Sequence, residues 1–136
     1  MTTADDNIQV IRGALEVVNT RAFDRVGEFI APGFVRHDLT GAYPGVDAAG
    51  VTDYLAEFLR GAPDLRVVVH DIFGAGDRVA VRLTLEGTHQ GQLFGRPGTG
   101  RGFAINQLNF YRLEGGKIAE TWQLVDIAGF MSQVGG

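Results

Sequence analysis

The chain has 136 residues, of which 45 % are hydrophobic, so it can bury one core without metal or disulfide support. It contains no cysteine, which excludes a disulfide framework, a thiolate nucleophile and a cysteine-based zinc site. The formal net charge is −4, and without a basic stripe to neutralise phosphates no nucleic-acid partner is expected. The length suits a single domain over residues 1–136.

The first residues, Met1 to Gln9, are polar and acidic, and they lack the positive start and apolar run of a secretory signal. No apolar stretch approaches the roughly 20 residues that a membrane helix needs. We therefore expect a cytoplasmic protein that does not bind a membrane.

Three helices are predicted in the first half of the chain. Apolar residues at three- and four-residue steps from Ile8 to Val18 predict the first helix, and Phe23 to Ile30 predict a shorter second one. Phe34 to Asp38 could be extended, and Gly41 to Gly45 is a loop. Asp47 is expected to cap a third helix, whose apolar face ends at Leu59 and which Gly61 closes.

After Pro63 the hydrophobic period changes from about 3.6 to two residues, which predicts strands. Two hairpin-like turns and a glycine-rich connection over 91–102 separate four long strands, at 65–72, 78–87, 103–112 and 117–126. Helices first and antiparallel strands later predict the α+β class. A short helical tail follows.

The third of these strands is apolar on both faces. Leu108 and Phe110 face opposite to Phe103 and Ile105. In so small a protein, a strand buried on both sides indicates that one sheet face covers helices and the other meets a second subunit. We expect a homodimer or a higher homo-oligomer.

The fourth strand offers a candidate acid–base group. Strict alternation puts Ile118, Glu120, Trp122 and Asp126 on one face. If that face lines a pocket, burial raises the pKa of Asp126 and makes it a competent base or acid. Alternatively, Asp126 ends the strand and caps the short helix at Ala128. Glu120 is expected to pair with a lysine or arginine.

Gln107 and Asn109 interrupt an otherwise apolar face of the third strand. Buried amides must find partners, and these two could hold a carbonyl or enolate oxygen of a ligand. A pair of satisfied core amides is the alternative.

The histidines form no metal-binding pattern, so no metal site is expected. His89 and then His37 are favoured as site residues, because both lie where a strand meets a loop. His70 is interpreted as structural. The chain also lacks the nucleophile-elbow and dinucleotide-binding motifs, which excludes most hydrolase and nicotinamide chemistry.

The chain resembles the SnoaL-like polyketide cyclases of the nuclear transport factor 2-like superfamily. Four stretches carry the resemblance: 34–38, 87–91, 95–103, and 111–112 together with 116–126. It implies three N-terminal helices packed on a strongly curved, mainly antiparallel sheet that forms a cone with one apolar pocket. Gly98 departs from the family, which commonly has a proline there.

The resemblance implies an intramolecular aldol closure of a polyketide-derived ring without metal or cofactor, because the substrate supplies its own electron sink. Asp126 would be the general acid and base, and His89 or Asn109 would stabilise the enolate. The implied substrate is small and hydrophobic or aromatic. Further substrate-binding residues are expected to be Trp122, Gln107, His37, Phe103, Phe34 and Tyr54.

Two alternatives remain open from the sequence. The first is another enzyme on the same fold, such as an epoxide hydrolase, a hydroxylase, or an isomerase that uses Tyr54 or Tyr111 beside two acids. The second is a protein that binds a hydrophobic ligand without catalysis, in which Asp126 is only a cap.

Overall fold

A computed structural model describes residues 3–40 and 46–135, so the predicted loop from Gly41 to Gly45 lies outside the described residues. The elements in chain order are α1 (Ala4–Thr20), η1 (Phe23–Glu28), β1 (Ile30–Asp38), β2 (Val46–Asp47), η2 (Ala48–Gly50), α2 (Val51–Gly61), β3 (Arg66–Ala75), β4 (Arg78–Thr88), β5 (Gly102–Glu114), β6 (Lys117–Val125) and α3 (Ile127–Gln133). The predicted α+β class is confirmed, with four long strands after the helices.

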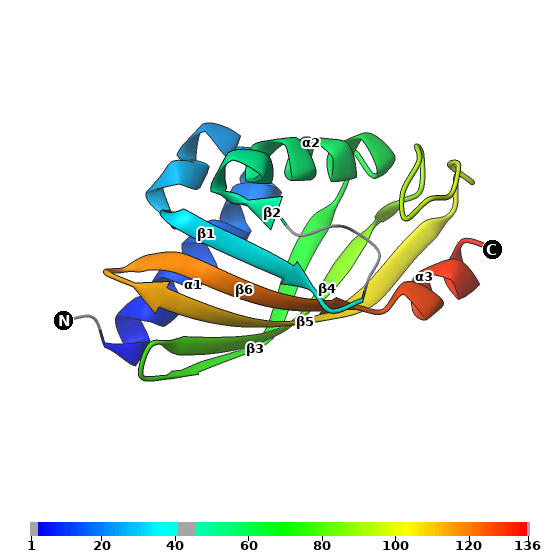
Figure 1. The fold of residues 1–136 in the computed structure, drawn as a ribbon. Coiled ribbons are helices and arrows are strands. Elements are labelled where there is room, and N and C mark those ends of the chain that lie inside the picture. Colours follow the sequence, from blue (N-terminus) through cyan, green and yellow to red (C-terminus); the bar gives the residue numbers. More distant parts are fainter. Residues whose placement is uncertain (1–2, 41–45, 136) are drawn as a thin grey trace.

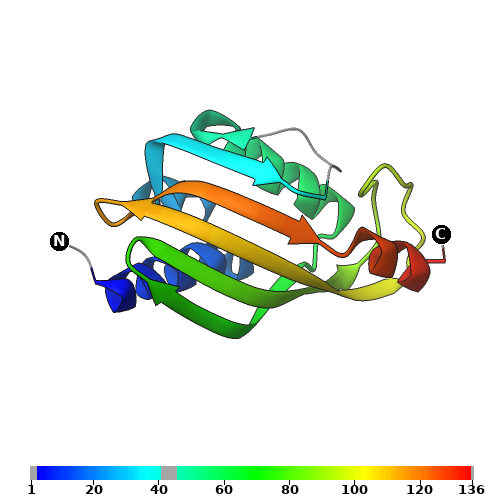
Figure 2. The same cartoon turned by 60° about the horizontal axis from the view of Figure 1, so that its bottom comes forward.

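The strands form one curved sheet in the order β2-β1-β6-β5-β4-β3. Every neighbouring pair is antiparallel except β1 and β6, which are parallel. Helices α1 and α2 lie on the same side of the sheet, and α3 lies at the end of β6 (Figures 1 and 2). The buried apolar core fills the space between these two helices and the inner face of the sheet.

Helix α1 begins and docks through polar side chains. Thr3 and Asp6 form a reciprocal capping box at its N-terminus, which satisfies two free backbone donors. Near its C-terminus the Asn19 amide accepts from the Val67 N–H at 2.7 Å and donates to the Val67 carbonyl at 2.9 Å. Asn19 thereby connects helix α1 to the backbone of β3, which is an edge strand of the sheet.

The second predicted helix is shorter than expected and of a different kind. Residues Phe23–Glu28 form a 3₁₀ helix, and Ile30 already belongs to β1. The reason is strand pairing, because the Ile118 N–H donates to the Phe29 carbonyl at 2.7 Å. Asp47 accepts from the Gly50 N–H at 3.0 Å, so it caps the 3₁₀ turn η2 that leads into α2.

Strand β6 contains a bulge that changes which side chains face inward. Arg112 pairs with Glu120 but Leu113 pairs with Ile118, so Ala119 is an extra residue in β6. Ile118 and Ala119 are both buried, and beyond them the inner face consists of Thr121, Gln123 and Val125. The expectation that Ile118 and Trp122 share one face is therefore wrong, because the bulge moves Trp122 to the opposite face.

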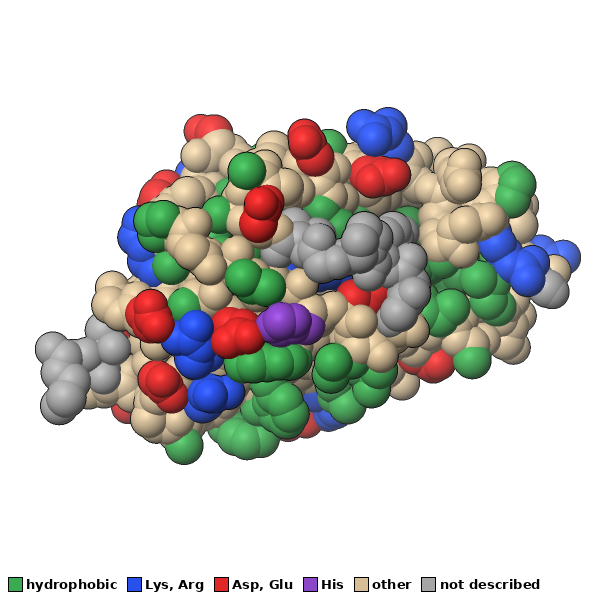
Figure 3. All heavy atoms as spheres, viewed as in Figure 1, with side chains coloured by type: hydrophobic (Ala, Val, Ile, Leu, Met, Phe, Trp, Pro, Cys, Tyr) green, Lys and Arg blue, Asp and Glu red, His purple; other side chains and the backbone are tan. Residues whose placement is uncertain are grey.

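The sheet face away from the helices is apolar. We call its large side chains the outer apolar face: Leu39, Phe73, Leu108, Phe110, Trp122 and Leu124. They surround a groove of about 320 Å³, and their patch is visible in the lower half of Figure 3. Phe73 is 65 % exposed and Phe110 is 62 % exposed. The predicted opposition of Leu108 and Phe110 to Phe103 and Ile105 is confirmed.

Candidate functional site

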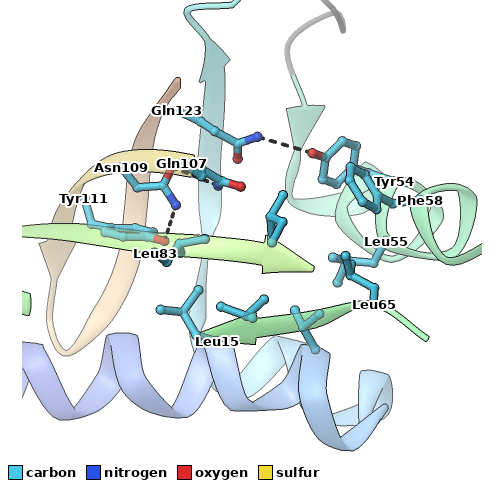
Figure 4. Close-up of a pocket in the computed structure, with 13 residues that line it drawn as sticks. Leu15, Tyr54, Leu55, Phe58, Leu65, Leu83, Gln107, Asn109, Tyr111 and Gln123 are labelled. Atoms are coloured by element: carbon cyan, nitrogen blue, oxygen red, sulfur yellow. Dashed lines mark hydrogen bonds between the residues drawn. The ribbon is translucent and has the colours of Figure 1, made fainter. Parts of the chain in front are cut away.

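The inner face of the sheet and the two long helices enclose a cavity of about 130 Å³. Its walls come from α1, α2 and strands β3 to β6, and they are largely aliphatic (Figure 4). The lining residues are Leu15, Val18, Tyr54, Leu55, Phe58, Leu65, Val67, Leu83, Leu85, Gln107, Asn109, Tyr111 and Gln123. A dry cavity of about 150 Å³ holds one benzene molecule, so this one accommodates about one ring of a ligand.

A row of polar side chains from β5 forms one wall of the cavity. Gln107, Asn109 and Tyr111 are two residues apart and therefore point the same way. The Gln107 amide donates to the Asn109 carbonyl oxygen at 3.0 Å, and the Asn109 amide donates to the Tyr111 hydroxyl at 2.7 Å (Figure 4). Burial raises the pKa of Tyr111 to about 12, so its phenol stays protonated at neutral pH.

A second polar cluster joins Arg36, Tyr54 and Gln123. Arg36 Nε donates to Gln123 Oε1 at 3.2 Å, and Arg36 Nη2 donates to the Tyr54 hydroxyl at 3.0 Å. The guanidinium carbon lies 4.0 Å from the centroid of the Tyr54 ring. Burial raises the pKa of Tyr54, and the positive charge of Arg36 opposes this shift. Tyr54 and Gln123 line the cavity, and Arg36 lies behind them.

Asp38 lies beside this cluster. It follows Arg36 by two residues on β1 and pairs with Gln123 in the ladder between β1 and β6. Its side chain is half-buried, and Oδ1 accepts from the Thr40 N–H at 2.9 Å. The negative charge of Asp38 contributes to the raised pKa of Tyr54. This carboxylate therefore acts electrostatically on a phenol that lines the cavity.

Asp126 lies in a different environment. It follows the last residue of β6, it is exposed, and Oδ1 accepts from the Gly129 N–H at 2.9 Å as the N-cap of α3. It does not line the cavity. Asp126 therefore caps the short helix, which is the alternative that the sequence left open. A role of Asp126 in proton transfer stays a prediction.

His89 is fully buried and holds a loop. Its Nε2 lies 3.2 Å from the Arg96 carbonyl oxygen and its Nδ1 lies 3.3 Å from Thr99 Oγ1. Because a carbonyl only accepts, Nε2 carries a proton and donates it to the Arg96 carbonyl. The ring also packs edge-on against Phe130 at 5.0 Å. His89 does not line the cavity, so its expected catalytic role lacks geometric support.

His37 and Trp122 lie on the outer side of the sheet. His37 Nε2 is 2.6 Å from Glu120 Oε2, and its ring stacks on Trp122 at 5.6 Å. Arg112 Nε also lies 3.2 Å from Glu120 Oε1, which confirms the expected arginine partner of Glu120. The hydrogen bond from His37 and the charge of Arg112 lower the pKa of Glu120. Neither His37 nor Trp122 lines the cavity.

Phe34 and Phe103 are buried in the hydrophobic core. Phe103 packs against Phe130 with ring centroids 5.2 Å apart, and neither phenylalanine lines the cavity. Of the nine expected site residues, the structure brings Tyr54, Gln107 and Asn109 together. The six that lie elsewhere are Asp126, His89, His37, Trp122, Phe34 and Phe103.

Sequence reasoning missed Gln123 and Arg36. The sequence held no signal for Arg36, because its burial depends on the pairing of β1 with β6, which is distant in sequence. Simple alternation along β6 puts Gln123 on the face opposite Trp122, and the bulge at Ala119 turns that face inward. Within the described residues, no group of three or more histidine, aspartate or glutamate side chains could hold a metal ion.

Proteins of similar sequence show which family the chain belongs to. The family model for SnoaL-like polyketide cyclases matches residues 8–134. The chain belongs to the SnoaL-like polyketide cyclase family. It is 32 % identical over 133 residues to the aklanonic acid methyl ester cyclase DnrD of Streptomyces peucetius, a match that covers 94 % of this chain and 90 % of that protein. The enzyme class expected for this chain agrees with the name of this relative.

Solved structures show the same fold. The putative polyketide cyclase IdmH from Streptomyces antibioticus is 31 % identical, with a TM-score of 0.85 over 96 % of this chain and 99 % of that chain. The putative hydroxylase AclR from Streptomyces galilaeus has a TM-score of 0.84 at 22 % identity, covering 98 % of each chain, which shows the fold alone. Among the described residues, no helix is both long and apolar enough to cross a membrane.

Proposed function

We propose that this chain closes a carbon ring in a small polyketide by intramolecular aldol addition, with the reacting ring in the cavity. One observation carries the proposal. An apolar cavity that accommodates about one ring has the amides of Gln107, Asn109 and Gln123 on its walls. Apolar walls with a few polar groups are typical of small-molecule sites. Family membership supports the reaction class.

In the proposed reaction a base removes a proton from a carbon flanked by two carbonyls. The enolate carbon then attacks a third carbonyl carbon, one carbon–carbon bond forms, and the π electrons of that carbonyl become an alkoxide. The protonated base returns its proton to the alkoxide. The Asn109 and Gln123 amides are donors that suit a developing enolate oxygen, and one such donor can be worth about 10²–10³ in kcat. The substrate delocalises the carbanion, so no cofactor takes part.

The proposed base is an aspartate. The sequence favours Asp126, whereas position favours Asp38, which lies beside the Arg36, Tyr54 and Gln123 cluster. Asp126 is exposed at a helix N-cap, so nothing in its surroundings removes it from water. Asp38 does not line the cavity either, but it is half-buried and pairs in the ladder with Gln123, which does line it, so we assign the proton transfer to Asp38. A positioned base of this kind contributes about 10²–10⁴-fold.

We further propose that the outer apolar face is covered by the same face of a second copy. Large exposed apolar patches on soluble proteins mark interfaces. The face is self-complementary in character, because it is apolar at its centre and carries the charged pair of Arg82 and Asp71 at the groove. The homodimer is thus the assembly that the surface favours.

A non-catalytic binding protein is the second candidate. One observation favours it, namely that the described lining of the cavity contains no carboxylate and no histidine. Such a protein would bind the substrate-like ligand and release it unchanged.

Turnover separates the two candidates. Aklanonic acid methyl ester and its free acid are incubated with the wild type, and product formation and binding are both measured. Val18→Phe fills part of the cavity, and Val10→Phe places the same ring on the same helix outside the lining. The cyclase proposal predicts turnover that Val18→Phe abolishes and Val10→Phe retains. Binding without turnover would favour the second candidate.

A further inference from the structure

Arg36 is a buried cation whose hydrogen-bond partners are neutral. The residue is 4 % exposed, and its Nε and Nη2 donate to an amide oxygen of Gln123 and a phenol oxygen of Tyr54. The ion pairs formed by residues 3–40 and 46–135 do not include Arg36. Buried charges are normally paired with an opposite charge, because removing an ion from water is costly.

The remaining nitrogen of the guanidinium has no partner at all. Arg36 Nη1 is buried and makes no hydrogen bond in the structure. The contact of the guanidinium with the Tyr54 ring offsets part of the lost hydration, but it leaves the N–H donors of Nη1 unsatisfied. A buried arginine with a free donor and no ion-pair partner is suited to an anionic oxygen that is supplied from outside the chain.

The position of Arg36 connects it to the cavity. Both of its partners line the cavity, and they face each other across one end of it (Figure 4). The Gln123 amide donates to the Tyr54 hydroxyl at 3.4 Å, which is a weak contact that a ligand can replace. Arg36 thus contacts two side chains that a ligand in the cavity would also contact.

We propose that Arg36 binds a carboxylate of the substrate and that this chain prefers a free acid to the corresponding neutral ester or amide. The proposal deepens the proposed function, since it takes the ligand of the cavity to be the substrate. The free Nη1 can donate a charge-assisted hydrogen bond to a carboxylate oxygen, and a neutral ester or amide group cannot match the charge of that carboxylate. Because the cavity accommodates about one ring, we expect the acid group to be attached to that ring or to lie close to it.

The test uses benzoate and benzamide, which have nearly the same shape and differ in charge. Titration calorimetry measures the binding of each to the wild type, to Arg36→Met and to the control Arg66→Met, which removes an exposed arginine paired with Glu86. The wild type and the control are expected to bind benzoate at least about tenfold more tightly than benzamide, the scale of a charge-assisted hydrogen bond. Arg36→Met is expected to bind the two ligands alike.

Thermal unfolding of the variants separates recognition from structure. A ligand role predicts that Arg36→Met keeps a cooperative transition while the acid preference is lost. Equal binding of benzoate and benzamide by the wild type, no binding of benzoate, or an undiminished preference in Arg36→Met would each overturn the proposal. The wild-type comparison decides the matter even where Arg36→Met does not fold. A wild type without an acid preference overturns only this inference, whereas a wild type without turnover overturns the proposed function.

Discussion

Asn109 donates a 2.7 Å hydrogen bond to the hydroxyl of Tyr111, two residues further along the same strand. Both side chains are buried at the cavity wall, and Gln107 continues the row by donating to Asn109. The row leaves one amide proton of Gln107 and one of Asn109 outside these two bonds. The free amide proton of Asn109 is one of the donors that the proposed enolate would meet.

Replacing Asn109 by leucine tests this wall. Asn109→Leu keeps the number and branching of the side-chain heavy atoms but removes the donor, so kcat is expected to fall by about 10²-fold while ligand binding changes less. The measurement is steady-state turnover with a parallel binding titration. Asn106→Leu, a change of the same kind at an exposed position of the same strand, is the matched control. Equal turnover in the two variants would contradict a role for the wall.

The buried phenol of Tyr111 predicts a dependence of stability on alkaline pH. Its pKa is about 12 in the folded protein against 10 in the unfolded chain, so the folded state holds the proton more tightly. This stabilisation is complete below pH 10 and is lost as the pH rises from 10 to 12.

Tyr111→Phe removes the titrating group. The free energy of unfolding of the wild type should fall by about 2–3 kcal/mol more than that of the variant across this range, as measured by urea unfolding at several pH values. At neutral pH the variant is expected to lose about 1 kcal/mol with the hydrogen bond from Asn109. Tyr54, whose pKa is also raised, leaves the variant a residual pH dependence. Parallel pH profiles of the two proteins would contradict the prediction, because they would show that burial does not raise the pKa of Tyr111.

His89 is expected to act in folding rather than in catalysis. His89→Ala leaves the Arg96 carbonyl and the Thr99 hydroxyl without their partner and opens space beside Phe130, so the protein should lose about 2–3 kcal/mol of stability. His70→Ala, at an exposed strand position, is the control and should change stability little. A His89 variant of wild-type stability with no turnover would instead support the catalytic role expected from the sequence.

The outer apolar face predicts the oligomeric state. Phe110→Glu places a charge in the middle of this face, where it would be buried without a partner between two copies. We expect the wild type to sediment as a dimer and Phe110→Glu as a folded monomer. Glu114→Lys, which changes charge at the far end of the same strand, should remain dimeric. A wild-type monomer at micromolar concentration would contradict the proposed interface.

The sequence predicted β5 correctly because its alternation is unbroken, which places Gln107 and Asn109 inside and Leu108 outside. It failed on β6, because one extra residue at Ala119 exchanges the two faces and the outer face is as apolar as an inner one. Hydrophobicity alone could not show which face was buried, so Trp122 was placed inside and Gln123 outside. Strand β1 shows a different limit, since the burial of Arg36 depends on the parallel pairing of β1 with β6, which is distant in sequence.

One comparison tests most directly whether Asp38 transfers the proton. Turnover is measured for the wild type, Asp38→Asn and Asp126→Asn with a substrate that the wild type converts, and binding of the same compound is measured in parallel. The structure predicts that Asp38→Asn binds the substrate and loses about 10²–10⁴-fold in kcat, while Asp126→Asn keeps its turnover because asparagine also caps helices. Full activity in Asp38→Asn with a large loss in Asp126→Asn would contradict the assignment and restore the exposed aspartate as the base.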